Sequence, residues 1–327
     1  MGIFDKFSKK NADKGTKEEV KTEEVKESAE KTNEESEAAE SNIIDINAKN
    51  RQTDADDKTE EKPKTTRFTL VVDCIKELEE DEGVIVGGNL HGTVNVNDKI
   101  FILHPMFKES RVISIDGIEL LDGENPGDGE KVDYATDKRI GLRLTSVKKK
   151  EQAPRFSVVT NIIPQLAPHP TKPLDNPFLL GLTYEYHRLI SDRMFADLFT
   201  FTVFSTGYLT PVELEKQPVA DESGAMKIMP NSKVGFKLLA NPDNKDEKML
   251  AVFTDFAALG KWKSLFENGK KPNSIMLSFD KCAEIALANS GYIINPFGPA
   301  PVLVAKQNIE YAQQMKSEMD KRIAEKK

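Results

Sequence analysis

Short stretches of alternating apolar and polar residues begin at Arg67, after a long polar start. Phe68–Asp73 alternates and is rich in β-branched residues, which is the pattern of a strand. We expect further short strands over 83–94 (two strands), 99–103, 111–115 and 139–147, with turn chemistry at 122–123 and 126–129. Short strands at close spacing with glycine turns predict a small antiparallel β-barrel over 65–150, because closure of a barrel removes exposed strand edges.

The stretch 151–176 is rich in proline: Pro154, Pro164, Pro168, Pro170 and Pro173. Each proline fixes one φ angle and removes one backbone donor, so we expect an extended, semi-rigid connector rather than a packed element.

Helical spacing begins at Asn176-Pro177, where asparagine suits the N-cap and proline the first helical position. Apolar residues recur every three to four positions as far as Phe199, which predicts one helix with a buried face. Further strands are expected at 208–214, 225–229, 233–240, 248–254, 274–277, 291–295 and 301–304, with helices beginning at 254–255 and near 278. Strands and helices interleave without a strict βαβ rhythm, so we predict an α+β domain over 177–306, followed by a polar helical tail over 307–327.

The first 64 residues have a different composition, dominated by Glu, Lys, Ser, Thr, Asn and Ala, with no aromatic residue between Phe7 and Phe68. Such a segment cannot bury enough apolar surface to offset chain entropy, so we predict a long disordered acidic tail over 1–64. The short apolar patch at 42–46 is either a motif that folds on binding or a chance cluster.

Targeting signals are missing from the chain as given. No apolar run follows the opening residues MGIFDKFSKK, and no stretch approaches the roughly 20 apolar residues of a membrane span. Ile3, Phe4 and Phe7 leave two interpretations open, a weak N-terminal contact with a membrane or a solvated tail. With two cysteines and no CxxC pair, the sequence predicts a cytoplasmic protein.

The net charge of -8 disfavours nucleic acid as a partner, because polyanions are repelled. The one basic cluster is Lys148-Lys149-Lys150, with Lys138 and Arg139. Two interpretations of it remain, an RNA contact or the solvated edge of the connector, and the excess of acidic residues over 65–150 weakens the first.

The segment 68–147 resembles the second domain of translational GTPases of the elongation factor Tu type. The resemblance is carried by Val71-Val72-Asp73, Gly83–Gly88, Gly92-Thr93-Val94, Pro126-Gly127-Asp128 and Gly141–Leu144, with Asn97 in place of the usual glycine before Asp98. It implies a β-barrel of about six strands, of the translation-protein type.

The segment 177–307 resembles the amino-terminal domain of the SseB family of bacterial proteins. The resemblance is carried by Tyr208-Leu209-x-Pro211-Val212, Met249–Asp255 and Gly291–Gly298, in this order. It implies an α+β domain without an agreed enzymatic activity.

Residues for catalysis or cofactor binding are not found in working arrangements. A GxxxxGK[ST] phosphate loop is missing, and 260–264 has the wrong spacing for one. None of the four histidines (His91, His104, His169, His187) has a partner at metal-ligand spacing, no GxSxG elbow occurs, and the apolar neighbours of Cys282 favour a buried structural role. We therefore expect no enzyme activity, no cofactor and no metal.

The turn Asn295-Pro296-Phe297-Gly298 is the most site-like feature of the predicted α+β domain. Phe297 either protrudes as an anchor for a partner or folds back onto the core; Trp262 is predicted to be core. The resulting hypothesis is a non-catalytic cytoplasmic adaptor of the SseB family that binds an unidentified protein. The alternative is a ribosome- or RNA-associated factor that uses the barrel, and an unrecognised enzyme would require a deep polar pocket with perturbed titrating groups.

Overall fold

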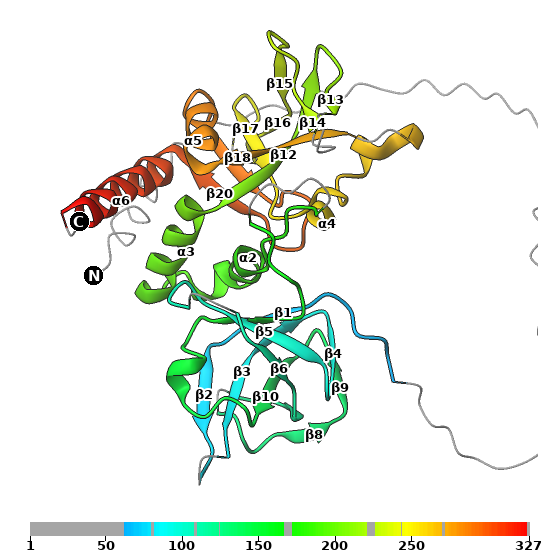
Figure 1. The fold of residues 1–327 in the computed structure, drawn as a ribbon, viewed down its shortest axis with the longest axis vertical. Helices are drawn as coiled ribbons and strands as arrows, with labels where there is room; N and C mark the ends of the chain where they lie inside the picture. The colour runs from blue at the N-terminus through cyan, green and yellow to red at the C-terminus, as the bar shows by residue number, and fades with distance from the viewer. Residues whose placement is uncertain are drawn as a thin grey trace, which may run out of the picture. The chain divides into compact units, whose positions relative to one another are not determined.

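The computed structural model describes residues 62–79, 82–107, 110–123, 125–166, 172–220, 226–242, 244–269 and 272–325. The predicted disordered tail lies outside the described residues except at 62–64. The patch at 42–46 and the first residues, with their predicted membrane contact, also lie outside the described residues. Lys62–Lys327 form one compact unit (Figure 1). No helix among the described residues combines the length and the apolar character needed to cross a membrane.

The amino-terminal part of this unit is a curled antiparallel sheet, a half-barrel, which confirms the predicted antiparallel β architecture in this coarser form (Figure 1). Its strands, as far as the structure describes the chain, are β1 (Thr69–Val71), β2 (Cys74–Glu77), β3 (Val84–His91), β5 (Lys99–Leu103), β6 (Val112–Ser114), β7 (Gly117–Leu120), β8 (Glu130–Val132), β10 (Arg139–Leu144) and β11 (Val158–Thr160). They follow the order β6-β5-β11-β1-β3-β10-β7-β8, with β2 also paired to β3. β4 (Thr93–Asn95) and β9 (Tyr134–Thr136) form a separate antiparallel pair.

Strand β11 corrects the prediction of an extended connector over 151–176. Val158–Thr160 pairs with β1 on one side and with β5 on the other, and all three residues are buried. A 3-10 helix, Lys150–Gln152, precedes it. The prolines of this stretch flank the strand without interrupting it, so both edges of β11 keep the donors that a central strand needs. The half-barrel therefore extends past residue 150.

Strand β3 explains Gly87 and Gly88. A Cβ atom at Gly88 would lie 2.1 Å from the carbonyl oxygen of Val71, and one at Gly87 would lie 2.4 Å from the Sγ of Cys74. The register between β3 and β10 is continuous through both glycines, so there is no bulge between these strands. These two glycines therefore allow a close approach of the neighbouring backbone and side chain.

Two helices stand where the sequence predicted one. α2 (Pro177–Leu189) begins at the predicted cap, where the Asn176 side chain accepts from the Leu179 N–H at 3.0 Å. The chain then breaks, and α3 (Arg193–Ser205) starts at Asp192, whose side chain accepts from the Met194 and Phe195 N–H groups. The sequence predicted a single helix because the apolar spacing continues across the break. Asp192 nevertheless caps the N-terminus of a second helix.

The carboxyl-terminal part contains two larger sheets. β12 (Gly207–Leu214) lies between β15 (Val234–Phe236) and β18 (Asn273–Ser278), all antiparallel. The other sheet has the order β16 (Leu238–Ala240), β17 (Lys248–Val252), β19 (Gly291–Ile294) and β20 (Val302–Ala305), with β17 and β19 parallel. β13 (Val219–Ala220) and β14 (Met226–Lys227) form a short pair.

Three further helices complete this part: α4 (Phe256–Leu259), α5 (Phe279–Leu287) and α6 (Lys306–Ala324). Asp255 and Ser278 cap α4 and α5 as predicted. The helix predicted from 254 to 269 is shorter than expected, because α4 ends at Leu259 and a 3-10 helix, Lys263–Gly269, follows Trp262. Gly260 at the C-cap is a poor residue for continuing a helix.

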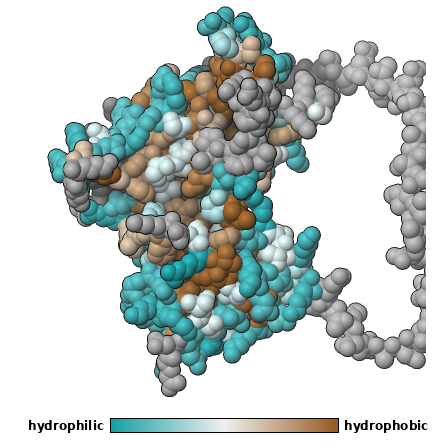
Figure 2. Space-filling model, viewed as in Figure 1, coloured by the Kyte–Doolittle hydropathy of each residue, from teal (hydrophilic) through white to brown (hydrophobic). Residues whose placement is uncertain are grey.

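One apolar core joins both parts of the unit. Val71, Leu103 and Val158 from the half-barrel pack in the same buried cluster as Leu179 of α2 and Phe195 of α3. A Cβ at Gly181 of α2 would lie 2.9 Å from Val158, which shows how closely this helix approaches the sheet. The division into two domains joined by a linker therefore stays a prediction. Elsewhere the visible surface is mostly polar with scattered apolar areas (Figure 2).

Candidate partner-binding site

The predicted turn at 295–298 follows directly from β19. Asn295 adopts a left-handed φ of 51°, which asparagine tolerates better than most residues. The Gly298 N–H closes the turn by donating to the Asn295 carbonyl at 2.9 Å, and Pro296 and Pro299 restrict the backbone around it. The result is a rigid turn.

Asn295 is the base of this turn rather than part of its exposed surface. Its side chain is 4% exposed, accepts from the Thr254 N–H at 3.0 Å and donates to the Thr254 hydroxyl at 3.0 Å. The Thr254 hydroxyl in turn donates to Asp255, the residue that caps α4. Of the four residues predicted to bind a partner, Asn295 therefore positions the others.

Phe297 lies between the two placements considered for it. Its ring rests on Trp262, with 4.7 Å between ring centroids and an interplanar angle of 32°, yet 40% of the residue is exposed. Trp262 is half-buried, not fully in the core, and its ring centroid lies 6.2 Å from that of buried Phe253. Trp262 thus contacts buried Phe253 on one side and half-exposed Phe297 on the other. We call the two outer side chains the Trp262–Phe297 pair.

A polar cleft lies beside this turn, and sequence reasoning missed it. One cavity of about 220 Å³ is lined by Arg67, His91, Tyr184, Asp255 and Lys261, among others. An adjoining cavity of about 540 Å³ shares Arg67, His91 and Tyr184 and reaches Pro299. These groups come from the start of the half-barrel, from β3, from α2 and from α4, so no local sequence signal connects them.

Arg67 in this cleft is already paired. Its guanidinium donates to both carboxylate oxygens of Asp175, at 2.7 and 3.0 Å, and lies 3.7 Å from Asp255. Burial acts to lower the pKa of Arg67, but the Asp175 hydrogen bond and charge outweigh it and raise that pKa. Burial also raises the pKa of Asp175, against the opposing effect of Arg67. The Arg67 guanidinium is thus committed to an ion pair within the protein.

A buried ion network continues from the cleft between α2 and the half-barrel. The Glu185 carboxylate, 2% exposed as a residue, contacts His91 Nε2 at 2.7 Å and accepts from Asn89 at 3.2 Å and from Arg188. Arg188 also contacts Asp73 at 2.8 Å. Arg139 donates to both oxygens of Asp73, at 2.7 and 2.9 Å. This Glu185 network joins β3, β10 and α2.

The Glu185 network predicts acid sensitivity. Burial acts to raise the pKa of Glu185 and of Asp73, but the hydrogen bonds from His91 and Arg139 and the nearby Arg188 charge lower both values overall. Below the ordinary pKa values of 4.5 and 3.8 the unfolded chain therefore binds more protons than the folded one. We expect the free energy of unfolding to be steady above about pH 5 and to fall as the pH decreases below about 4.5. Urea unfolding at a series of pH values measures this free energy. If it decreases as steeply with falling pH in a Glu185→Gln variant as in the parent, Glu185 is not a source of the acid sensitivity.

Lys148, Lys149 and Lys150, the residues considered for RNA contact, are all exposed at the entrance to the 3-10 helix. The Lys150 N–H donates to the Glu77 carboxylate at 3.0 Å, and exposed Glu151 follows in the chain. These carboxylates reduce the positive potential that a phosphate backbone requires.

Nucleophiles and metal ligands show no site in the described part of the chain. Cys282 is fully buried, and burial raises the pKa of its thiol far above the ordinary value, so it is not a thiolate nucleophile. His187 makes a T-shaped contact with Tyr186, while His169 lies outside the described residues. Among the described residues, no group of three or more His, Cys, Asp or Glu side chains is placed to hold a metal ion.

Comparison with known families finds a match within the carboxyl-terminal part. Residues 200–311 match the model of the SseB protein N-terminal domain. The matched segment runs from α3 to α6 and includes both Trp262 and Phe297. A search of curated proteins finds no match. The resemblance of the half-barrel to the second domain of elongation factor Tu stays a prediction.

Proposed function

We propose that this chain is a non-catalytic, cytoplasmic adaptor that binds another protein through the Trp262–Phe297 pair. The observation that carries the proposal is a large aromatic side chain, 40% exposed, displayed on a rigid and internally hydrogen-bonded turn. The match of this region to the SseB N-terminal domain supports a shared, domain-level role.

The energetics of the pair suit a binding anchor. Exposed aromatic side chains supply most of the binding energy in many interfaces, because a partner buries a large apolar area on them. The Asn295–Thr254 hydrogen bonds and the flanking prolines fix the backbone before binding, so little conformational entropy is lost when the partner docks.

A non-catalytic role is supported by how the polar groups are used. Arg67, Asp175, Glu185 and Asp73 are committed to ion pairs within the protein. The Cys282 thiol is buried among apolar groups. These ion pairs stabilise the fold, and Arg67 faces the polar cleft already paired with Asp175.

Replacing Phe297 by alanine tests the proposal. We expect the affinity for the partner to fall by about thirtyfold, which corresponds to an anchor worth about 2 kcal/mol. The partner is first identified by photo-crosslinking from benzoylphenylalanine placed at position 297, and its Kd for the purified full chain is then measured.

The matched control is Tyr134→Ala, because Tyr134 is 37% exposed but lies on β9 of the half-barrel. This variant should bind like the parent. Equal Kd values for the parent and Phe297→Ala, or crosslinks that form only from position 134, would overturn the proposal.

A further inference from the structure

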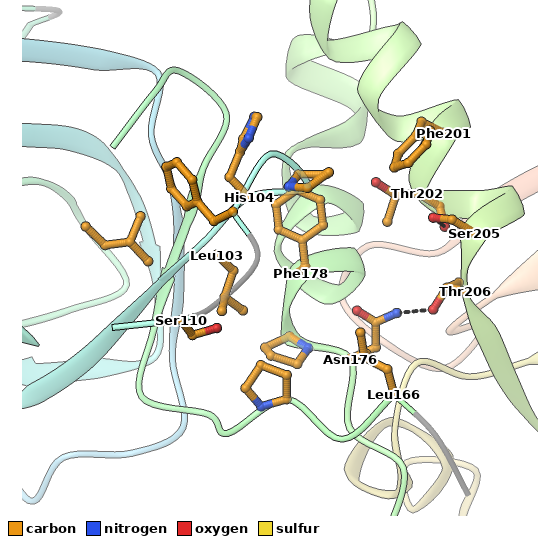
Figure 3. Close-up of a pocket in the computed structure, with 15 residues that line it drawn as sticks. Leu103, His104, Ser110, Leu166, Asn176, Phe178, Phe201, Thr202, Ser205 and Thr206 are labelled. Carbon is orange, nitrogen blue, oxygen red and sulfur yellow. Dashed lines mark hydrogen bonds between the residues drawn. The ribbon is translucent and has the colours of Figure 1, made fainter. Parts of the chain in front are cut away.

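An apolar cavity separate from the polar cleft lies between the end of β5 and helices α2 and α3 (Figure 3). Its volume of about 360 Å³ falls in the range of roughly 300–1,000 Å³ that is typical of small-molecule pockets. Neither the Trp262–Phe297 pair nor the Glu185 network lines it.

One wall of the cavity is aromatic and aliphatic. Its side chains include Leu103, Phe107, Leu166, Phe178 and Phe201. His104 adds an imidazole ring, with its centroid 5.7 Å from that of Phe107 and 6.4 Å from that of Phe178, the latter in a T-shaped arrangement. Rings in such positions favour an aromatic guest, which gains edge-to-face contacts beyond simple burial.

The wall formed by α3, which also bears Phe201, carries hydroxyl groups whose protons are directed into the protein (Figure 3). Thr202 donates to the Leu198 carbonyl at 2.8 Å, and Ser205 donates to the Thr202 carbonyl at 3.3 Å. The Thr206 hydroxyl donates to the Gly207 carbonyl, with 3.5 Å between the two oxygens, and accepts from Asn176 (dashed in Figure 3). The lone pairs of the Thr202 and Ser205 oxygens remain available, so this wall offers acceptors and calls for a donor.

A ligand that carries a formal charge does not suit this cavity. Among the lining residues that the structure describes, none is Asp, Glu, Lys or Arg. His104 Nδ1 lies 3.3 Å from the Met106 N–H that it accepts, which assigns the proton of the neutral ring to Nε2. Burial lowers the pKa of His104 and so keeps the ring neutral at pH 7. A charged ligand would lose its hydration without gaining a counter-charge.

We propose that this cavity binds an uncharged planar aromatic group that bears a single N–H or O–H donor, such as an indole or a phenol. The ring lies against Phe107, Phe178 and Phe201, and its donor meets the hydroxyl oxygen of Thr202 or Ser205. Such a group is either a free small molecule or a tryptophan or tyrosine side chain of a partner. The inference does not depend on Phe297.

Titration of the full chain with indole and with benzofuran, its isostere that lacks the N–H, tests the donor. Isothermal titration calorimetry and ligand-observed NMR should show saturable indole binding with a Kd of about 1 mM or lower. Indole should bind about fivefold more tightly than benzofuran, which is the usual effect of one hydrogen bond. In Thr202→Val this preference should shrink, while benzofuran binding is kept.

A second pair of variants locates the binding. Ser205 is exposed at the mouth of the cavity, so Ser205→Trp should obstruct it and reduce indole binding at least tenfold. Met194→Trp places the same ring at an exposed position of α3 outside the lining and should bind indole like the parent. N-acetyltryptophanamide distinguishes the sources: its binding indicates a partner's side chain, whereas binding of indole alone indicates a free small molecule.

Absence of saturable indole binding to a folded protein would overturn the proposal, as would equal indole affinity in the parent and in Ser205→Trp. Identical Kd values for indole and benzofuran would refute the donor assignment, on which the ligand class depends. Circular dichroism and thermal unfolding establish that each variant is folded.

Discussion

Glu185→Ala is expected to lower the free energy of unfolding by about 3 kcal/mol, because it removes a buried carboxylate and leaves the polar groups around it without their acceptor. The substitution leaves His91 and the Asn89 amide without their acceptor, and it leaves Arg188 with Asp73 as its remaining carboxylate in the network. Unfolding in urea, followed by circular dichroism, measures the loss.

Glu284→Ala is the matched control for this loss. Glu284 also lies in a helix and also pairs with a cation three residues away, Lys281, but both side chains are more than half exposed. Its removal should cost less than about 1 kcal/mol, the range for exposed ion pairs. Equal losses in the two variants would show that the Glu185 network contributes no more than a surface pair.

Elements whose signals are local were predictable from the sequence. The sequence predicts helix starts at Asn176, Asp255 and Ser278, and each of these side chains accepts a hydrogen bond from a backbone N–H three residues ahead. β-branched alternation likewise located β1, and the run from Arg139 located β10. Capping and strand alternation depend on neighbours within a few residues, so one sequence contains the necessary information.

Elements defined by tertiary pairing were missed. Val158–Thr160 is only three residues long and lies between prolines, yet it occupies the centre of the sheet because β1 and β5 flank it. β2 ends in the charged pair Lys76-Glu77 and has no apolar alternation, and its pairing with β3 decides its conformation. Strand propensity is a weak guide where such context decides the conformation.

The candidate site divides in the same way. The turn at 295–298 is predictable from its own asparagine, prolines and glycine. The hydrogen bonds that hold the turn in place are not, because they come from a distant residue. Thr254, which holds Asn295, is 41 positions away in the chain. His91 lines the polar cleft and contacts Glu185, yet these two residues are 94 positions apart in the chain. A lone sequence cannot reveal which distant polar groups will meet.

The second large effect is expected from Gly88→Ala, which should lower the free energy of unfolding by about 3 kcal/mol, the upper end of the usual cost of overpacking. The new methyl group would lie 2.1 Å from the Val71 carbonyl oxygen, a backbone atom that cannot rotate away, so β1 and β3 must separate. Gly117→Ala is the control, because a Cβ there meets its nearest neighbour, the Arg143 side chain, at 3.6 Å. Ordinary contact at that distance predicts a change within about 0.5 kcal/mol. If both alanines are tolerated equally in urea unfolding, β3 does not approach β1 as closely as Gly88 implies. A selective loss at Gly88 would instead show that this glycine is needed for the packing of β3 against β1.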